Sequence, residues 1–250
     1  MKKGNTKVKA AIIVIGNEIL SGRTQDINVT FLSKWLNDLG VRVGEVRIIE
    51  DNEEAIITCI SELKKNFKYV FTTGGIGPTH DDITSKSIAK AFKLKYDFHK
   101  EAYDILEKYY KPGEFTEGRK KMAKIPENAT LIYNPSSGAP GFIVENVFCL
   151  PGVPSILKSM VDGLKDKIVG GEKVLSQTIS VQTVESEIAK SLETVQNQFQ
   201  DVEIGSYPFF RLGKIGVSIV IRSIEKKQID DCYKEIVSFL KKRKIRIIER

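Results

Sequence analysis

The sequence of 250 residues contains only two histidines, His80 and His99, and three widely separated cysteines. Two histidines exclude a zinc site built from several imidazoles and leave at most one histidine for a catalytic triad. A metal would therefore have to rest on carboxylates, which suits Mg²⁺ or Mn²⁺. Cys59, Cys149 and Cys232 form no Cys-X-X-Cys pair, and each lies among apolar residues. We therefore expect buried free thiols and a cytoplasmic protein.

Long apolar runs are also missing. The run at residues 10–15 follows a basic start, but it is too short for a secretory signal, and polar residues follow at once. No segment approaches membrane-spanning length, so we expect no membrane partner. The formal charge of +7 comes mostly from lysine. No basic run is interleaved with aromatic residues, so we interpret the charge as a solvated surface and expect no nucleic-acid partner.

Apolar runs and amphipathic stretches alternate through residues 1–170, which we predict to be the first domain. Strands at residues 10–15, 41–49 and 69–72 are each followed by a helix, and this βαβαβα order predicts a parallel sheet with right-handed crossovers. The remaining elements predicted for this domain are helices at 99–110, 115–124 and 155–164, a strand at 131–133, and a hairpin of strands at 142–144 and 147–150.

The Gly170-Gly171 pair marks a predicted boundary, so residues 171–250 form a second, smaller α+β domain. Its predicted elements are strands at 174–181, 202–207, 216–222 and 245–248, with helices at 185–199 and 227–242. The order βαββαβ is that of the ferredoxin-like split unit.

The stretch YVFTTGGIGPTHDD, at residues 69–82, runs from an apolar strand through a glycine-rich turn to two adjacent carboxylates. Glycines let backbone N–H groups approach an anion closely, and the start of a helix favours negative charge. We predict a site for a phosphorylated ligand with a divalent cation. The alternative is an ordinary turn in which Asp81 or Asp82 caps the next helix. The ligand contacts assigned here are Thr73, Gly74, Gly75, Gly77, Pro78 and Thr79.

Two other strands of the predicted sheet also end in carboxylates, since Glu18 follows the first strand and Asp51 follows the second. Ligands of open α/β sheets bind at the carboxyl ends of the strands. Convergence of acidic groups there suits metal-assisted phosphoryl chemistry, although each residue could instead be a helix cap or a surface group. The ligand contacts assigned to this edge are Gly16, Glu18, Ser21, Asp26 and Asn28, of which Asp26 and Asn28 could equally be caps.

Two loops rich in glycine and proline, at residues 134–141 and 151–154, lie beside predicted strands. By composition alone they are surface loops. As parts of a site they would surround a ligand with backbone groups. The residues assigned to that role are Ser137, Gly138, Pro151 and Gly152.

Together these motifs resemble the molybdopterin-binding-like domain of the CinA (competence- and damage-inducible protein A) family and of the N-terminal part of animal FAD synthase. The similar segments are IGNEILSGRTQDIN (15–28), DNEE (51–54), TTGGIGPTHDD (72–82), SSGAPGF (136–142) and LPGVPSIL (150–157). IGSYPFF (204–210) is similar to a stretch of the small domain that follows in FAD synthase. The resemblance implies a parallel-sheet α/β domain with a β-hairpin extension, followed by a small βαββαβ domain called KH-like. Asn17 departs from it, because aspartate is common there.

The resemblance implies a metal-dependent nucleotide pyrophosphatase that acts on an ADP-ribose-like or FAD-like dinucleotide. Asp51 and Asp82 would be catalytic, because the related molybdenum-cofactor proteins use the corresponding carboxylates. Asp51, Asp81 and Asp82 would hold Mg²⁺, Mn²⁺ or Co²⁺, with K⁺ as a further ion. The alternatives are a protein that binds or adenylylates molybdopterin, and a non-catalytic ligand-binding module. We expect a nucleotide or pterin ligand and a homodimer. The GxxG at residues 213–216 matches that of RNA-binding KH domains, but it precedes a strand instead of joining two helices.

Overall fold

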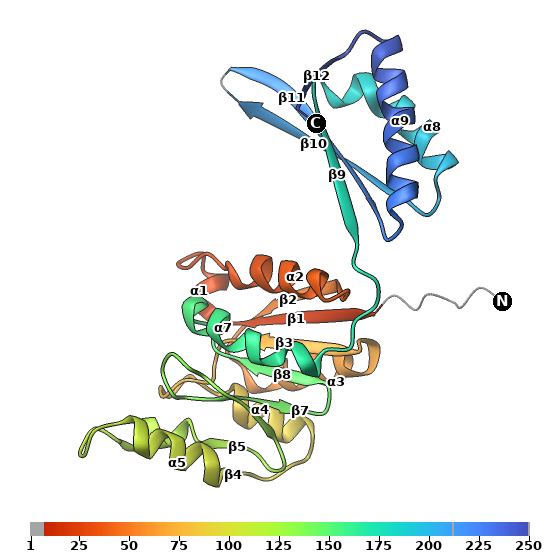
Figure 1. Ribbon diagram of the computed structural model, residues 1–250. Helices are drawn as coiled ribbons and strands as arrows, with labels where there is room; N and C mark the ends of the chain where they lie inside the picture. Colours follow the sequence, from red (N-terminus) through yellow and green to blue (C-terminus); the bar gives the residue numbers. More distant parts are fainter. Residues whose placement is uncertain (1–7, 212, 250) are drawn as a thin grey trace, which may run out of the picture. The chain divides into compact units, whose positions relative to one another are not determined.

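The computed structural model describes residues 8–211 and 213–249, and it divides into two compact units between Gly171 and Glu172 (Figure 1). Each unit has its own hydrophobic core. No helix of the described residues is both long and apolar enough to cross a membrane.

The large unit is built on a six-stranded sheet in the order β2-β1-β3-β8-β7-β6. The strands are β1 (Lys9–Ile15), β2 (Arg42–Ile49), β3 (Tyr69–Thr73), β6 (Thr130–Ile132), β7 (Gly141–Val144) and β8 (Val147–Leu150). β2, β1, β3 and β8 are parallel to one another, whereas β7 runs antiparallel to both of its neighbours. The predicted parallel sheet with a hairpin is confirmed.

Helices cover both faces of this sheet (Figure 1). They are α1 (Asn17–Leu20), α2 (Asn28–Asp38), α3 (Glu53–Asn66), α4 (Thr84–Ala91), α7 (Pro154–Val161) and the 3₁₀ helix η1 (Asp162–Lys167). Side chains of β1 alternate between two cores. Ile13 packs in the core that contains Ile56 of α3, and Ile12 packs in the core that contains Leu32 of α2. This double burial explains why the sequence of β1 is continuously apolar.

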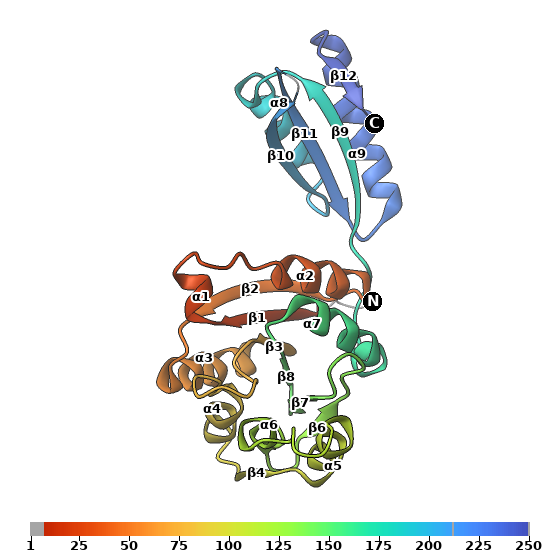
Figure 2. The same cartoon turned by 90° about the vertical axis from the view of Figure 1, so that its left-hand side faces the viewer.

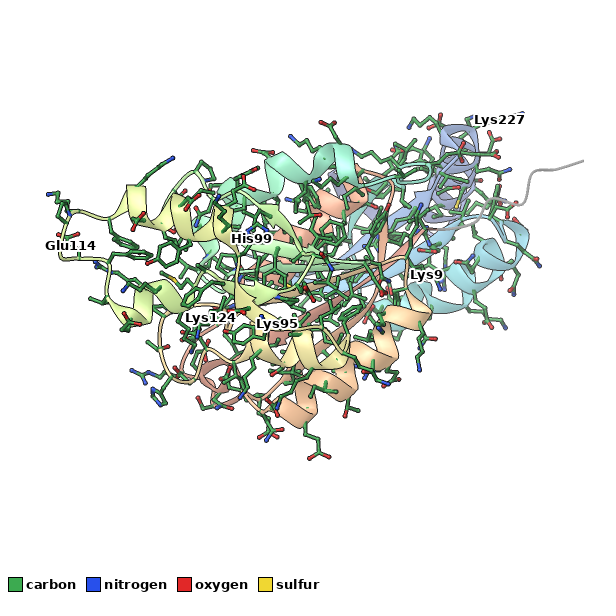
Figure 3. The ribbon with its side chains drawn as sticks, turned by 90° about the horizontal axis from the view of Figure 1, so that it is seen from below. Lys9, Lys95, His99, Glu114, Lys124 and Lys227 are labelled. Carbon is green, nitrogen blue, oxygen red and sulfur yellow. The ribbon has the colours of Figure 1, made fainter. Side chains whose placement is uncertain are left out.

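Residues 96–126 form an excursion that lies at the β6 and β7 end of the sheet (Figure 2). It contains β4 (Tyr96–Phe98), α5 (Lys100–Tyr109), α6 (Glu117–Lys121) and β5 (Lys124–Pro126). Figure 3 labels Glu114 at the outer end of the excursion, and Lys95 and Lys124 beside its two-stranded sheet.

The helix predicted for residues 115–124 is wrong at its end, because α6 stops at Lys121 and residues 124–126 form a strand. β5 pairs with β4 in an antiparallel ladder, and Ile125 is buried in the core. Pro126 prevents a helix from continuing through this segment. Pairing with β4 instead satisfies the backbone hydrogen-bonding groups of β5.

The small unit is a four-stranded antiparallel sheet in the order β10-β11-β9-β12. Its elements are β9 (Leu175–Gln182), α8 (Glu185–Gln198), β10 (Glu203–Arg211), β11 (Lys214–Ser223), α9 (Lys226–Lys242) and β12 (Arg246–Glu249). The predicted βαββαβ order is confirmed. The GxxG at residues 213–216 lies where β11 begins after its hairpin turn, so it joins strands and not the helices that a KH loop requires.

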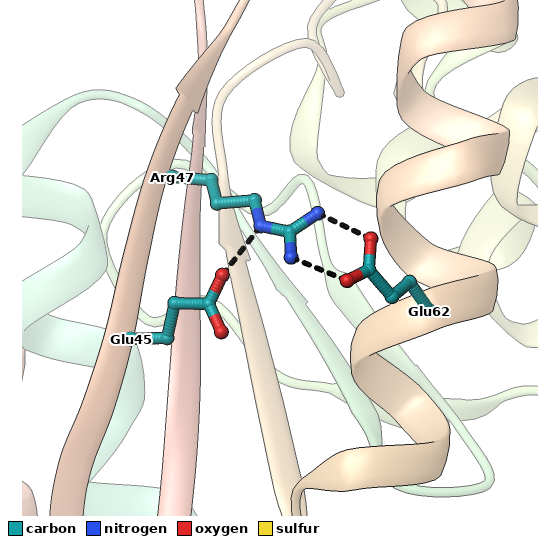
Figure 4. A network of polar contacts seen from close by, with 3 residues as sticks. All are labelled: Glu45, Arg47 and Glu62. Atoms are coloured by element: carbon teal, nitrogen blue, oxygen red, sulfur yellow. Dashed lines mark hydrogen bonds and ion pairs between the residues drawn. The ribbon is translucent and has the colours of Figure 1, made fainter.

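Arg47 ties the edge strand β2 to α3 (Figure 4). Its Nη1 and Nη2 donate to the two carboxylate oxygens of Glu62 at 2.7 and 2.9 Å, and its Nε donates to Glu45 at 2.6 Å. The hydrogen bonds from Arg47 lower the pKa of Glu62. The planar guanidinium suits this two-pronged contact in a way that lysine could not.

All three cysteines are free and buried, as predicted. Burial raises the pKa of Cys232 to about 11, and it also raises the pKa of Cys59 and Cys149. These thiols therefore stay protonated and unreactive at neutral pH.

Tyr69 anchors the last residues of the large unit. Its hydroxyl donates to the carbonyl oxygen of Val169 at 3.2 Å and accepts from the N–H of Val169 at 2.8 Å.

Tyr69→Phe removes both hydrogen bonds to Val169. We expect the free energy of unfolding of the large unit to fall by about 1 kcal/mol and its melting temperature to fall by roughly 2–4 °C. Fluorescence of Trp35, the single tryptophan, follows unfolding of the large unit alone. Tyr133→Phe is the control, because the exposed Tyr133 hydroxyl only donates to Glu101 and its loss should leave the melting temperature unchanged.

Candidate functional site

The carboxyl ends of β2, β1, β3 and β8 form one continuous edge. The N–H of Gly16 donates to the carbonyl oxygen of Ile49 at 3.1 Å, and the N–H of Gly74 donates to that of Leu150 at 3.1 Å. Across the same edge, the Asn28 side chain donates to the carbonyl oxygen of Gly152 at 2.8 Å. The structure therefore brings the ends of four strands together, as the parallel topology requires.

The Gly74-Gly75 turn depends on glycine at both positions. Gly74 has a φ of +100°, and a Cβ on it would lie 2.2 Å from the carbonyl oxygen of Ile15. Gly75 has a φ of +67°, and a Cβ on it would lie 2.1 Å from the Thr84 hydroxyl. Only glycine fits a left-handed backbone that is packed this closely. This crowding holds the turn against β1 and the start of α4.

The amides of this turn differ from the prediction at one position. Gly74 was predicted to offer its N–H to a ligand, but that N–H is already bonded to Leu150. The N–H groups of Gly75 and Gly77 have no hydrogen-bond partner within the described residues. The donors open to an anion are therefore in residues 75–77 and not at the end of the strand itself.

Buried polar atoms without partners gather at this edge. Asn28 Oδ1, Thr73 Oγ1 and Thr84 Oγ1 belong to side chains that are at most 3% exposed, and none of these atoms has a hydrogen-bond partner. They are three of the six such atoms in residues 8–211 and 213–249. An unpaired buried polar group costs about 1–3 kcal/mol, so its persistence calls for a ligand or water that completes it.

Asp51 and Asp82 each use one carboxylate oxygen to hold the backbone. Asp51 Oδ2 accepts from the N–H of Asn17 at 2.9 Å. Asp82 Oδ2 accepts from the N–H and the hydroxyl of Thr79 at 2.7 and 2.5 Å. In the part of the chain that the structure covers, Oδ1 of neither residue makes a hydrogen bond. Each carboxylate therefore keeps one oxygen for a ligand.

The capping alternatives are resolved residue by residue. Asn52 and not Asp51 caps α3, since its side chain accepts from the N–H of Ala55. Neither Asp81 nor Asp82 caps α4, which begins at Thr84 without a side-chain cap. Asp26 does act as a cap, because its Oδ1 accepts from the N–H of Val29 at 2.9 Å.

Asp81 is exposed, and its pKa is held below the ordinary value mainly by contact with the Thr79 hydroxyl. The charges of His80 and Lys121 act in the same direction. Because the hydroxyl carries one proton, it can serve only one of the two neighbouring aspartates at a time.

Glu18 and Ser21 lie at the edge but are exposed. The carboxylate of Glu18 folds back on Gly16, where an added Cβ would lie 2.6 Å from Glu18 Oε1. The Ser21 hydroxyl donates to the backbone carbonyl of Glu18 at 3.3 Å.

The loop after β8, which begins with Pro151, borders the glycine turn. Gly152 of this loop packs on Gly74, because a Cβ added to Gly152 would lie 3.4 Å from the Gly74 Cα.

Backbone N–H groups of the loop at residues 134–138 form hydrogen bonds within the loop itself. Asn134 Oδ1 accepts from the N–H groups of Ser136 and Ser137 at 2.9 and 3.0 Å, and the N–H of Gly138 donates to the Asn134 carbonyl at 3.3 Å. The N–H groups of Ser137 and Gly138 are therefore satisfied within the loop, and the assignment of these two residues as ligand contacts stays a prediction.

The three predicted metal ligands are not assembled into a cluster. Among residues 8–211 and 213–249, no three His, Cys, Asp or Glu side chains gather as a group that could hold a metal ion. Asp51 is held by Asn17, whereas Asp81 and Asp82 are held by Thr79. The donor set fits only an ion that takes most of its ligands from phosphate oxygens and water, as Mg²⁺ often does.

Two residues at this edge were not predicted. Thr84 contributes the buried hydroxyl against Gly75, and Lys121 of α6 donates from Nζ to the carbonyl oxygen of Thr79. Thr84 could have been suspected from its place two residues after the paired aspartates. Nothing in the sequence distinguishes Lys121 from the basic residues beside it.

Two hollows of the large unit can be compared with this edge. One of about 390 Å³ lies beside β6, between Glu101, Tyr133 and Lys167. The other, of about 440 Å³, is an open depression at the end of β2, lined by Ile49, Glu50 and Asn52 on either side of Asp51. Neither is lined by a glycine of the turn or by an unpaired buried atom, so we place the functional site at the strand ends.

Comparisons with known proteins agree with this fold. Residues 11–170 match the family described as a probable molybdopterin binding domain, and residues 173–249 match the middle domain of FAD synthase. A protein of Archaeoglobus fulgidus is 36% identical over 197 residues, which cover 79% of this chain and 84% of that protein.

Two further relatives extend the comparison. A probable FAD synthase of Caenorhabditis elegans is 33% identical over 225 residues, which cover 80% of this chain but only 43% of that protein. The crystal structure of a CinA protein of unknown function from Thermoplasma acidophilum is 32% identical with a TM-score of 0.61. It covers 65% of this chain and 98% of that chain.

Proposed function

Because the chain belongs to the family of probable molybdopterin binding domains, in a CinA-like form joined to a FAD synthase middle domain, we propose that it binds and hydrolyses a nucleotide pyrophosphate. The site is the edge formed by the carboxyl ends of β2, β1, β3 and β8. The substrate class is a dinucleotide such as ADP-ribose or FAD.

The observation that carries this proposal is the group of unpaired buried atoms Asn28 Oδ1, Thr73 Oγ1 and Thr84 Oγ1 beside the open amides of residues 75–77. The amides suit phosphate oxygens, which need donors. The hydroxyls can donate to phosphate, and the amide oxygen of Asn28 can accept from a hydroxyl or amino group of the ligand. A ligand with both phosphate and donor groups would satisfy all of them.

Asp51 and Asp82 would act on the pyrophosphate through their free Oδ1 atoms. Asp82 Oδ1 accepts the proton of a water molecule whose oxygen attacks one phosphorus, which is general base catalysis. The bond from that phosphorus to the bridging oxygen breaks, and the second phosphate leaves with the electron pair. ADP-ribose then gives AMP and ribose 5-phosphate, and FAD gives AMP and FMN. A divalent cation held by these carboxylates and the phosphates would neutralise charge on the phosphate oxygens.

Hydrolysis by the unaltered protein tests the proposal directly. The protein is incubated with ADP-ribose and with FAD, in the presence of Mg²⁺, Mn²⁺ or Co²⁺, with and without K⁺. We expect AMP to accumulate with at least one pair of substrate and ion. Absence of AMP under every condition would reject the hydrolase.

A pterin is the second candidate ligand, favoured by the description of the matching family as molybdopterin binding. A thermal-shift screen separates the two, because a ligand that binds only the native state raises the melting temperature by mass action. Stabilisation by a pterin together with AMP transfer from ATP would favour the second candidate. The homodimeric state and the cytoplasmic location stay predictions.

A further inference from the structure

Helix α6 of the excursion reaches the loop that follows the glycine turn. Lys121 Nζ donates to the carbonyl oxygen of Thr79. Gly118, one turn earlier, lies so close that a Cβ on it would be 3.1 Å from the carbonyl oxygen of Pro78. The excursion therefore fixes the position of the Pro78-Thr79 segment, although some forty residues separate them in sequence.

The three consecutive basic residues of α6 have different surroundings. Arg119 lies over the Tyr110 ring at 4.2 Å and 3.7 Å from Glu114. Lys120 pairs with Glu117 at 2.7 Å. In the described part of the chain, Lys121 makes no ion pair with a carboxylate, and its hydrogen bond is to a backbone carbonyl. Its positive charge is therefore not cancelled by a direct partner.

Lys121 also lies at the start of a chain of contacts that ends on Asp82. Lys121 donates to the carbonyl oxygen of Thr79. The N–H and the hydroxyl of Thr79 in turn donate to Asp82 Oδ2. The uncancelled positive charge of Lys121 therefore lies beside the Thr79–Asp82 turn, where it lowers the repulsion that an incoming pyrophosphate would meet.

We propose that Lys121 is a positioning residue of the strand-end site, which holds the Thr79–Asp82 turn in place and supplies positive charge for a pyrophosphate ligand. This inference rests on the proposed function, and it assigns the excursion a role in ligand binding. It also explains how a site without a preformed acidic cluster for metal can accept a dianionic ligand next to its own carboxylates.

The test compares Lys121→Met, Lys121→Arg and Lys120→Met in the full chain, with ADP-ribose as the probe. Methionine keeps the length of the side chain but removes its charge and donors. We expect Lys121→Met to weaken ADP-ribose binding about 10- to 100-fold, the effect of losing a hydrogen bond to a charged group. Lys121→Arg should restore most of the affinity, and Lys120→Met, on the same helix, should bind as the unaltered protein does.

The dependence of binding on NaCl separates charge from simple structural support. The affinity of the unaltered protein should fall as salt rises, and Lys121→Met should flatten that dependence, since one screened attraction is gone. Equal losses in Lys121→Met and Lys120→Met, or an unchanged salt dependence, would overturn the inference.

A ligand-free measurement keeps this inference separate from the proposed function. Hydrogen exchange of the Thr79 backbone N–H, which donates to Asp82 Oδ2, should be faster in Lys121→Met than in the unaltered protein, because the turn loses its hydrogen bond to α6. An unchanged exchange rate would contradict the positioning role of Lys121. If the unaltered protein binds neither ADP-ribose nor FAD, the proposed function fails, while hydrogen exchange still decides whether Lys121 holds the turn.

Discussion

Replacing Gly74 with alanine is expected to destabilise the large unit by about 3 kcal/mol and to lower its melting temperature by roughly 6–12 °C. Two costs add at this position. The φ of +100° is unfavourable for any residue with a Cβ, and that Cβ would lie 2.2 Å from the carbonyl oxygen of Ile15. Because the obstacle is backbone in the buried end of β1, relief requires β1 and β3 to move apart.

Gly22→Ala is the matched control for this prediction. Gly22 has a φ of +72°, but an added Cβ would meet nothing within 4 Å. It should show only the cost of the left-handed backbone, about 1 kcal/mol. Trp35 fluorescence during thermal unfolding measures both variants in the unit that contains the site. Equal effects of the two substitutions would show that the close contact of Gly74 with β1 does not exist.

The parts of the fold that could be predicted are those set by local patterns. The apolar run at residues 10–15 predicted a strand of the parallel sheet, and the structure confirms it as β1, with Ile12 and Ile13 in opposite cores. The order of elements predicted both the parallel sheet and the βαββαβ unit. Such patterns are sufficient because they depend on periodicity within one segment and not on which distant segment lies alongside.

The errors arose where a distant partner decides the structure. Residues 124–126 form a strand because β4 offers a ladder to pair with, a fact that no local pattern contains. Gly74 was expected to present its N–H, but its partner is Leu150 on a strand formed far along the chain. In both cases the backbone took the hydrogen bond that the folded topology supplied.

The candidate site divides in the same way. Residues that follow the strands, such as Asp51 and Asp82, could be proposed because the ends of parallel strands must share an edge. Lys121 could not, because its role depends on the direction in which one side chain of a short helix leaves the excursion. The assignment of Ser137 stays a prediction, and the bond from its N–H to the side chain of Asn134 is a contact that the sequence pattern did not indicate.

Asp82→Asn is expected to lower kcat/KM for the pyrophosphate substrate about 10²- to 10⁴-fold, the range for loss of a general base. The fold should survive, because the amide oxygen of asparagine can still accept from the N–H and hydroxyl of Thr79. What disappears is the negative charge and the second acceptor, Oδ1, which makes no hydrogen bond within the described residues. Measurement combines the rate of AMP release with the melting temperature of the large unit.

Asp162→Asn is the control for this substitution. Asp162 is an exposed carboxylate of η1 that pairs with Lys165 at 2.8 Å, outside the strand-end site, so its loss should leave the rate unchanged. Asp51→Asn provides the comparison within the site, because its Oδ2 likewise holds a backbone N–H while Oδ1 is open. If Asp82→Asn keeps more than about a tenth of the activity while Asp51→Asn loses it, Asp51 is the base instead. Losses in both variants, with the melting temperature preserved, would mean that the two carboxylates act on the same pyrophosphate.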